Sequence, residues 1–138
     1  MPKSINYFLL NSTLSQKIET QRQLCIKKDL NELNLWISAL EELNDELNYF
    51  NIIEKQLVKK GSISSSIQGL RRKNVLIMAT FCKYDQALKN EYEYGKTEYN
   101  ALRANIHENK RAQYIQLVKE FNTLKKHIYQ ILIKYHRK

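Results

Sequence analysis

The sequence contains very few residues that interrupt helices. Its 138 residues include one proline, Pro2, and three glycines, Gly61, Gly69 and Gly95. Proline ends helices through steric clash and a lost hydrogen-bond donor, and glycine costs about 1 kcal/mol relative to alanine in a helix interior. A chain so poor in both, with 43% hydrophobic residues, predicts a single all-α domain over residues 1–138, built from a few long helices.

Cysteines and long apolar runs are also scarce. Cys25 and Cys82 form no C-x-x-C motif and have apolar sequence neighbours, which predicts two unpaired, buried thiols in a reducing, cytoplasmic setting. No apolar run approaches the roughly 18 residues of a membrane span. Residues 5–10 resemble a signal peptide only in part, because the apolar core is short and no small-residue cleavage site follows. We therefore expect residues 1–12 to form a packed N-terminal arm, with a secreted form as the alternative.

Motifs for catalysis and metal binding are missing. His107, His127 and His136 are too far apart in sequence to form an i, i+3 or i, i+4 metal-binding pair, and we expect them to be solvated. The chain has no Glu-x-x-His, no glycine-rich phosphate loop and no nucleophile elbow. The sequence therefore predicts no catalytic residue, no metal ligand and no cofactor, and a protein that is not an enzyme.

Apolar residues recur at steps of three and four along most of the chain, which is the period of an amphipathic helix. A capping box at residues 13–16 (TLSQ) predicts a first helix over 14–60, followed by a polar loop at 61–66. A second helix is predicted over 66–106, a turn in the polar stretch near 105–109, and a third helix with heptad-like spacing over 110–137.

Short connections make neighbouring helices antiparallel. The predicted fold is therefore an elongated up-down-up antiparallel bundle of three long helices. A second capping box at residues 29–32 (DLNE) leaves open a break near Asp29, which would give four helices.

The net charge of +9 is unevenly distributed. Residues 29–54 hold seven acidic side chains and no basic one, whereas residues 109–138 hold eight basic side chains and one acidic one. The first and third helices of an up-down-up bundle are adjacent, so we expect the acidic band to face the basic helix. Exposed ion pairs contribute only about 0–1 kcal/mol each, but a complementary field helps to set which helices adjoin.

A turn centred on residue 63 would place residue i of the first helix level with residue 126 − i of the second. Cys25 and Cys82 would then be offset by roughly 28 Å along the bundle axis. A disulfide needs Cα atoms within about 7 Å, so this register also predicts two free thiols.

The same register gathers basic residues at one end of the bundle. Clustered positive charge and arginine forks suit phosphate groups, so this basic pole is a candidate site for nucleic acid or an anionic surface. The other interpretation is a solvated helix end that increases solubility. The residues are Lys55, Lys59, Lys60, Arg71, Arg72, Lys73, Lys134, Arg137 and Lys138.

Four residues define a candidate interaction surface. Trp36, Tyr49 and Ile52 lie partly off the main apolar stripe of the first helix, and Tyr94 projects away from the other tyrosines of the second. Exposed apolar side chains of this kind mark protein–protein contacts. Because long bundles commonly pair, we expect a protein partner, with a homodimer as one form of it.

Trp36, residues 47–51 (LNYFN) and residues 120–126 (EFNTLKK), set within three long amphipathic helices, resemble uncharacterised bacterial helical-bundle proteins. The resemblance implies the fold and a bacterial, cytoplasmic setting, but no activity and no site residues. The hypothesis from the sequence is a non-enzymatic helical interaction or scaffold protein. The alternative is a nucleic-acid-binding protein that uses the basic pole.

Overall fold

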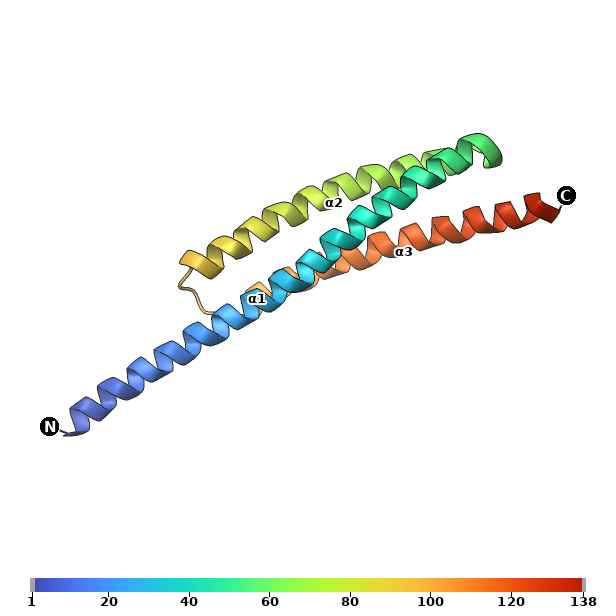
Figure 1. The fold of residues 1–138 in the computed structure, drawn as a ribbon. Coiled ribbons are helices and arrows are strands. Elements are labelled where there is room, and N and C mark those ends of the chain that lie inside the picture. Colours follow the sequence, from blue (N-terminus) through green and yellow to red (C-terminus); the bar gives the residue numbers. More distant parts are fainter. Residues whose placement is uncertain (1, 138) are drawn as a thin grey trace.

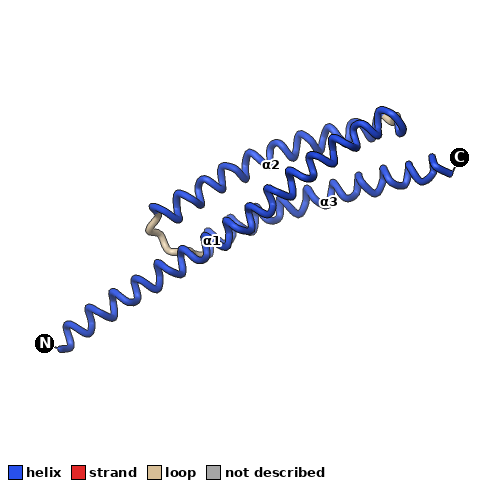
Figure 2. Tube along the Cα trace, in the orientation of Figure 1, coloured by secondary structure: helices blue, strands red, loops and turns tan. Residues whose placement is uncertain are grey.

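The computed structural model describes residues 2–137, and the side chains of residues 13–134. Its elements are α1 (Pro2–Ile53), the π-helical turn η1 (Glu54–Val58), α2 (Gly61–Tyr94) and α3 (Ala101–Arg137), with no strand in the described part of the chain. Helix α2 runs back along α1, and α3 returns in the direction of α1 (Figure 1). The predicted all-α, up-down-up bundle of three helices is confirmed, and two short connections join its helices (Figure 2).

Helix α1 is longer and more continuous than predicted. It begins at Pro2, so residues 2–12 continue the helix, and the capping box at 13–16 lies inside it. The predicted packing of residues 1–12 concerns side chains outside the described residues. The helix also passes Asp29 without a break, so the four-helix alternative is wrong. The Asp29 carboxylate accepts a hydrogen bond from Tyr99 instead of capping a new helix.

The first connection is much shorter than predicted. Only Lys59 and Lys60 separate η1 from α2. Lys59 adopts the left-handed conformation (φ 53°) that commonly ends a helix, and its N–H donates to the Glu54 carbonyl at 2.7 Å. The serine-rich stretch 61–66 is helical because Ile63 and Ile67, four residues apart, both enter the core. This burial outweighs the modest helix propensity of serine.

The second connection lies at residues 95–100, about ten residues before the predicted turn. The Gly95 N–H donates to the Glu91 carbonyl at 2.9 Å, and Asn100 caps α3 by accepting the Arg103 N–H through Oδ1 at 3.1 Å. The polar stretch 107–113 is helical. Ala112 is its only apolar residue, and two of its polar residues, His107 and Arg111, bind polar partners on α1.

The helices pair in a different register from the one predicted. Asn74 Nδ2 donates to the Leu40 carbonyl at 3.2 Å, and the rings of Trp36 and Phe81 lie 5.6 Å apart. These pairs are level along the bundle, about ten residues from the predicted register, because the connection is shorter and begins earlier.

The core follows one stripe of each helix, with members mostly three, four or seven residues apart. Each fully buried leucine, isoleucine or phenylalanine stabilises the fold by about 1.5–3 kcal/mol. The described part of the chain contains no helix that combines the length and apolar character needed to cross a membrane. The core residues are Ile26, Leu33, Trp36, Leu40, Leu43, Leu47 and Phe50 of α1, Ile63, Ile67, Leu70, Phe81 and Leu88 of α2, and Leu117, Phe121, Leu124 and Ile128 of α3.

The N-terminal part of α1 projects beyond the other two helices (Figure 1). Residues 13–21 are all exposed, and Arg22 is the first described residue that is buried. Its guanidinium donates to the carbonyl oxygens of Glu91 at 2.6 Å and Tyr92 at 3.5 Å. A cation at the last carbonyls of a helix interacts favourably with the negative end of the helix dipole. Arg22 therefore marks where the bundle begins.

The predicted contact between the acidic band and the basic helix is confirmed at two points. Arg111 pairs with Glu32 at 2.5 Å, and Lys125 pairs with Glu46 at 3.0 Å. Both pairs join α1 to α3.

Cys25 and Cys82 are free, as predicted. The predicted burial is wrong for Cys82, which is exposed on α2, and Cys25 is only half-buried. Apolar sequence neighbours were misleading because residues adjacent in a helix point about 100° apart.

Gly69 and Gly95 provide a matched pair of alanine substitutions. A Cβ at Gly69 meets no atom within 4 Å, so Gly69→Ala should raise the free energy of unfolding by about 0.4–1 kcal/mol. A Cβ at Gly95 would lie 2.6 Å from the Glu91 carbonyl oxygen, so Gly95→Ala should lower it by about 1–3 kcal/mol. Urea unfolding followed by circular dichroism measures both. A Gly95→Ala variant as stable as the parent would contradict the close approach described here.

Candidate functional site

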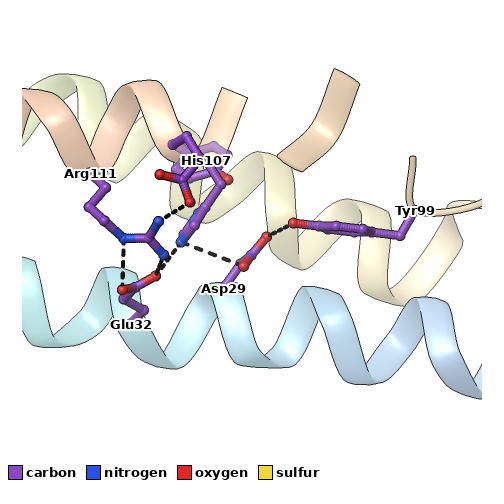
Figure 3. Close-up of polar contacts among 7 residues, drawn as sticks. Asp29, Glu32, Tyr99, His107 and Arg111 are labelled. Atoms are coloured by element: carbon purple, nitrogen blue, oxygen red, sulfur yellow. Dashed lines mark hydrogen bonds and ion pairs between the residues drawn. The ribbon is translucent and has the colours of Figure 1, made fainter. Parts of the chain in front are cut away.

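The most distinctive site is a polar cluster where the three helices meet, which we call the polar junction (Figure 3). Asp29 and Glu32 come from α1, Tyr84 from α2, Tyr99 from the second connection, and His107 and Arg111 from α3. Asp29 is 7% exposed and His107 is 3% exposed. Buried charges need partners, and the arrangement of the junction supplies them.

His107 is at the centre of the junction. Its Nε2 lies 2.7 Å from Glu32 Oε1 and 3.5 Å from Asp29 Oδ1. Because ionised carboxylates only accept hydrogen bonds, Nε2 carries the hydrogen. Nδ1 lies 2.8 Å from the Tyr84 hydroxyl, and in the neutral ring it accepts the phenol hydrogen. The prediction of a solvated His107 is therefore wrong, whereas His127 is exposed and the His136 side chain lies outside the described residues.

Burial keeps both tyrosines of the junction protonated. It raises the pKa of Tyr84 above its usual value, and the nearby carboxylates of Asp29 and Glu32 raise it further. Burial and the hydrogen bond to Asp29 raise the pKa of Tyr99 in the same way. The Tyr99 hydroxyl donates to Asp29 Oδ2 at 2.5 Å, so it ties the second connection to the middle of α1.

Arg111 neutralises Glu32 through a two-point contact. Its Nε donates to Glu32 Oε2 at 3.1 Å, and its Nη2 donates to Oε1 at 2.5 Å. Arg111 also pairs with Glu108 one turn earlier in α3. The hydrogen bonds that Glu32 accepts from Arg111, and a further one from His107, hold the pKa of the Glu32 carboxyl below its usual value.

The junction also brings together three groups of the type that bind metal ions. The ligand atoms of Asp29, Glu32 and His107 all lie within 4.8 Å of one another, and two carboxylates with one imidazole suit several divalent metals. However, the Arg111 guanidinium already contacts both oxygens of Glu32, and the His107 N–H faces the carboxylates. A metal ion would have to displace these donors, so the geometry fits a charge-compensated hydrogen-bond network better than a metal centre.

A cleft of about 370 Å³ opens beside the junction, near the second connection. Its polar lining groups bind one another: Arg103 pairs with Glu91 at 2.7 Å, and Tyr99 bonds to Asp29. Leu88, Leu102 and Ile106 complete a mainly apolar surface. The cleft therefore offers space but few unsatisfied polar groups to orient a substrate.

The structure gathers only part of the predicted basic pole. Lys55, Lys59 and Lys60 are exposed in η1 and the first connection, and Lys134 is exposed near the C-terminal end of α3. The C-terminal end of α3 lies at the end of the bundle where α1 turns into α2 (Figure 1). The segment 71–73 (Arg71, Arg72, Lys73) begins ten residues into α2, about 15 Å from this end.

Lys73 also pairs with Glu120 at 2.8 Å. The side chains of Arg137 and Lys138 lie outside the described residues. Anion binding by the four lysines stays a prediction.

The predicted interaction surface is divided in a similar way. Tyr49, Ile52 and Tyr94 are exposed. Trp36 is buried and stacks on the rings of His107 at 5.0 Å and Tyr114 at 5.7 Å, so its predicted exposure is wrong. It lies three residues after Leu33 and four before Leu40, which places it on the buried stripe.

A search of family models, of curated proteins and of solved structures finds no match to this chain. The resemblance to bacterial helical-bundle proteins therefore stays a prediction, and the function of the chain has to be inferred from its own geometry.

Tyr99→Phe tests whether the junction stabilises the fold. The variant leaves a buried Asp29 oxygen without its donor, so the free energy of unfolding should fall by about 1–3 kcal/mol. Tyr94→Phe is the matched control, because Tyr94 is 79% exposed and its change should be near zero. Urea unfolding of both variants gives the comparison. Equal stability of Tyr99→Phe and the parent would contradict a structural role of the hydrogen bond.

The pH dependence of stability tests the pairing of Glu32. Because its pKa is lowered on folding from the usual 4.5, the carboxylate stabilises the fold above about pH 4.5. This stabilisation is lost as the pH falls through the lower folded pKa. Glu32→Gln should therefore lower the free energy of unfolding by about 1–3 kcal/mol at neutral pH.

The difference from the parent should shrink in acid, as urea unfolding over a pH series would show. Glu98→Gln, at an exposed residue with no described ion pair, is the control. A difference for Glu32→Gln that does not change with pH would contradict the pairing.

Proposed function

We propose that this protein is a non-enzymatic helical scaffold that binds a protein partner through the projecting part of α1. The observation that supports this most is the exposed area. The chain exposes 10032 Å², whereas a compact monomer of its mass, 16.5 kDa, exposes about 7,600 Å². The excess exceeds the total of about 1,200–2,000 Å² that a specific interface buries.

The projecting part of α1 has an apolar face of its own. Leu14 is 51% exposed and Ile18 is 47% exposed, and residues four apart lie on the same side of a helix. A single helix outside a bundle is only marginally stable in water. A partner that offers a helix or an apolar groove would bury these anchors and stabilise the segment.

The polar junction supports a structural role for the chemistry-bearing residues. Its carboxylates are matched by Arg111, His107 and Tyr99, so these groups are occupied in holding the helices together. A cytoplasmic setting is part of the proposal and is supported by the two free cysteines, one of them exposed, because free thiols persist in reducing compartments.

The double variant Leu14→Glu, Ile18→Glu tests the proposed surface. Two charges on the apolar face should reduce partner recovery by at least about tenfold, as measured by quantitative mass spectrometry after affinity capture with the tagged full chain. Circular dichroism should be unchanged, because both residues lie outside the bundle.

The matched control is Gln16→Glu, Thr20→Glu, which adds the same charge at two exposed residues with the same spacing. Proteins enriched by the parent should be retained by the control. Equal loss from both double variants, or equal retention by both, would contradict the proposal.

A further inference from the structure

Two shallow grooves lie side by side on the surface formed by α1 and α2. One has a volume of about 500 Å³ and includes Glu41 and Asp45 of α1, and the other has a volume of about 350 Å³ and includes Arg71 and Arg72 of α2. They adjoin because both are lined by Val75, and no residue of α3 lines either one. We call this the α1–α2 surface.

The α1–α2 surface carries apolar side chains that are open to solvent. Val75, which lines both grooves, is 65% exposed, and Leu76, which lines the α2 groove, is 69% exposed. Half-buried Met78 lines the groove beside Val75. Adjacent exposed aliphatic side chains bordered by polar residues are typical of a protein-binding surface.

The charges that border these apolar side chains have no partners among the described residues. Arg71, Arg72, Glu41 and Asp45 form no ion pair there, although Lys73, two residues from Arg71, pairs with Glu120 on the other side of α2. Basic groups line the α2 side of the surface and acidic groups line the α1 side. Such a surface is complementary in charge to a copy of itself.

The register of α1 and α2 places the acidic and basic groups of this surface at matching heights along the bundle. The hydrogen bond from Asn74 to the Leu40 carbonyl places Arg71 and Arg72 at nearly the same height as Glu41 and Asp45. A two-fold axis running along the groove, parallel to the helices, would preserve height and set α2 of each copy over α1 of the other. The arginines of each copy would then face the carboxylates of the other, with Val75, which lines both grooves, between them.

We propose that the α1–α2 surface binds a second copy of this chain in a symmetric dimer. Two-fold symmetric pairing uses the same patch on both subunits. This suits a surface with one basic side and one acidic side, because each side then meets its opposite in the second copy. The inference extends the proposed scaffold function, and it leaves the projecting part of α1 free for a different partner.

Charge exchange between two variants tests the inference. One variant is Glu41→Arg, Asp45→Arg, and the other is Arg71→Glu, Arg72→Glu. In a symmetric dimer each variant places like charges together at both contacts, so self-association should weaken at least about tenfold. In an equimolar mixture every contact joins opposite charges, so a mixed dimer should form at least as tightly as the parent dimer.

Sedimentation equilibrium over a concentration series measures all three associations. The matched controls are Glu42→Arg and Lys126→Glu, which change charge at exposed residues that line neither groove, and both should dimerise like the parent. A parent chain that stays monomeric at every concentration would overturn the inference. So would variants that each dimerise normally, or a mixture that shows no recovery.

The two proposals fail in distinguishable ways. If self-association is lost in the Leu14→Glu, Ile18→Glu variant but kept in both charge variants, the second copy binds the projecting helix and the α1–α2 inference is wrong. If the charge variants dissociate the dimer while affinity capture finds no partner for the projecting helix, the inference holds and the scaffold proposal is the one contradicted.

Discussion

The structure depends on how two acidic side chains are accommodated on and beside the buried stripe of α1. Asp29 lies on this stripe with Ile26, Leu33 and Trp36, where an unpaired charge would be strongly destabilising, and the partly exposed Glu32 lies at its edge. Their compensation requires donors from elsewhere in the chain. The second connection therefore brings Tyr99 to Asp29, and α3 brings His107 and Arg111 to Glu32. An aliphatic stripe would tolerate several positions of α3 along α1, but these directional bonds favour one.

Buried polar groups of this kind contribute more to specificity than to stability, because desolvation offsets much of their attraction. Here the apolar ring contacts of Trp36 add the stability that the buried polar groups do not supply. Trp36 stacks on His107 and Tyr114 and also contacts Phe81, so one α1 side chain touches both other helices. Further along the bundle, Asn74 also fixes the position of α2 against α1, through its hydrogen bond to the Leu40 carbonyl. Together these contacts set the heights at which the surface charges of α1 and α2 lie.

The helices differ in how much of their length packs against the other two. Helix α2 ends at Tyr94, and the second connection leads directly into α3, so neither covers the part of α1 before Arg22. Every described residue from 13 to 21 is consequently exposed. The projecting part of α1 is exposed because α2 and α3 do not extend along it, and the α1–α2 surface is exposed because no residue of α3 lines its grooves.

Much of the architecture could be predicted from the sequence, because the scarcity of glycine and proline and the three-to-four periodicity are local signals. The facing of acidic and basic helices could also be predicted from charge. The positions of the two connections could not be predicted. The burial of Ile63 and Ile67 makes a serine-rich stretch helical, and the second connection begins at Gly95 instead of in the polar stretch 107–113.

The polar stretch 107–113 was the clearest indication of the polar junction in the sequence. His107 and Arg111 are four residues apart, and so lie on one face of a helix, as Asp29 and Glu32 do at three. The sequence pattern alone does not predict that the acidic pair on α1 contacts the basic pair on α3, because this contact depends on the helix register, which the connections determine.

The most direct test of the central claim is a nuclear magnetic resonance measurement on the single tryptophan. If the polar junction sets the register of the helices, the Trp36 indole protons should show nuclear Overhauser contacts to the rings of His107, Tyr114 and Phe81. Contacts to residues of α2 and α3 about two turns away, or an indole without contacts to either helix, would contradict the account.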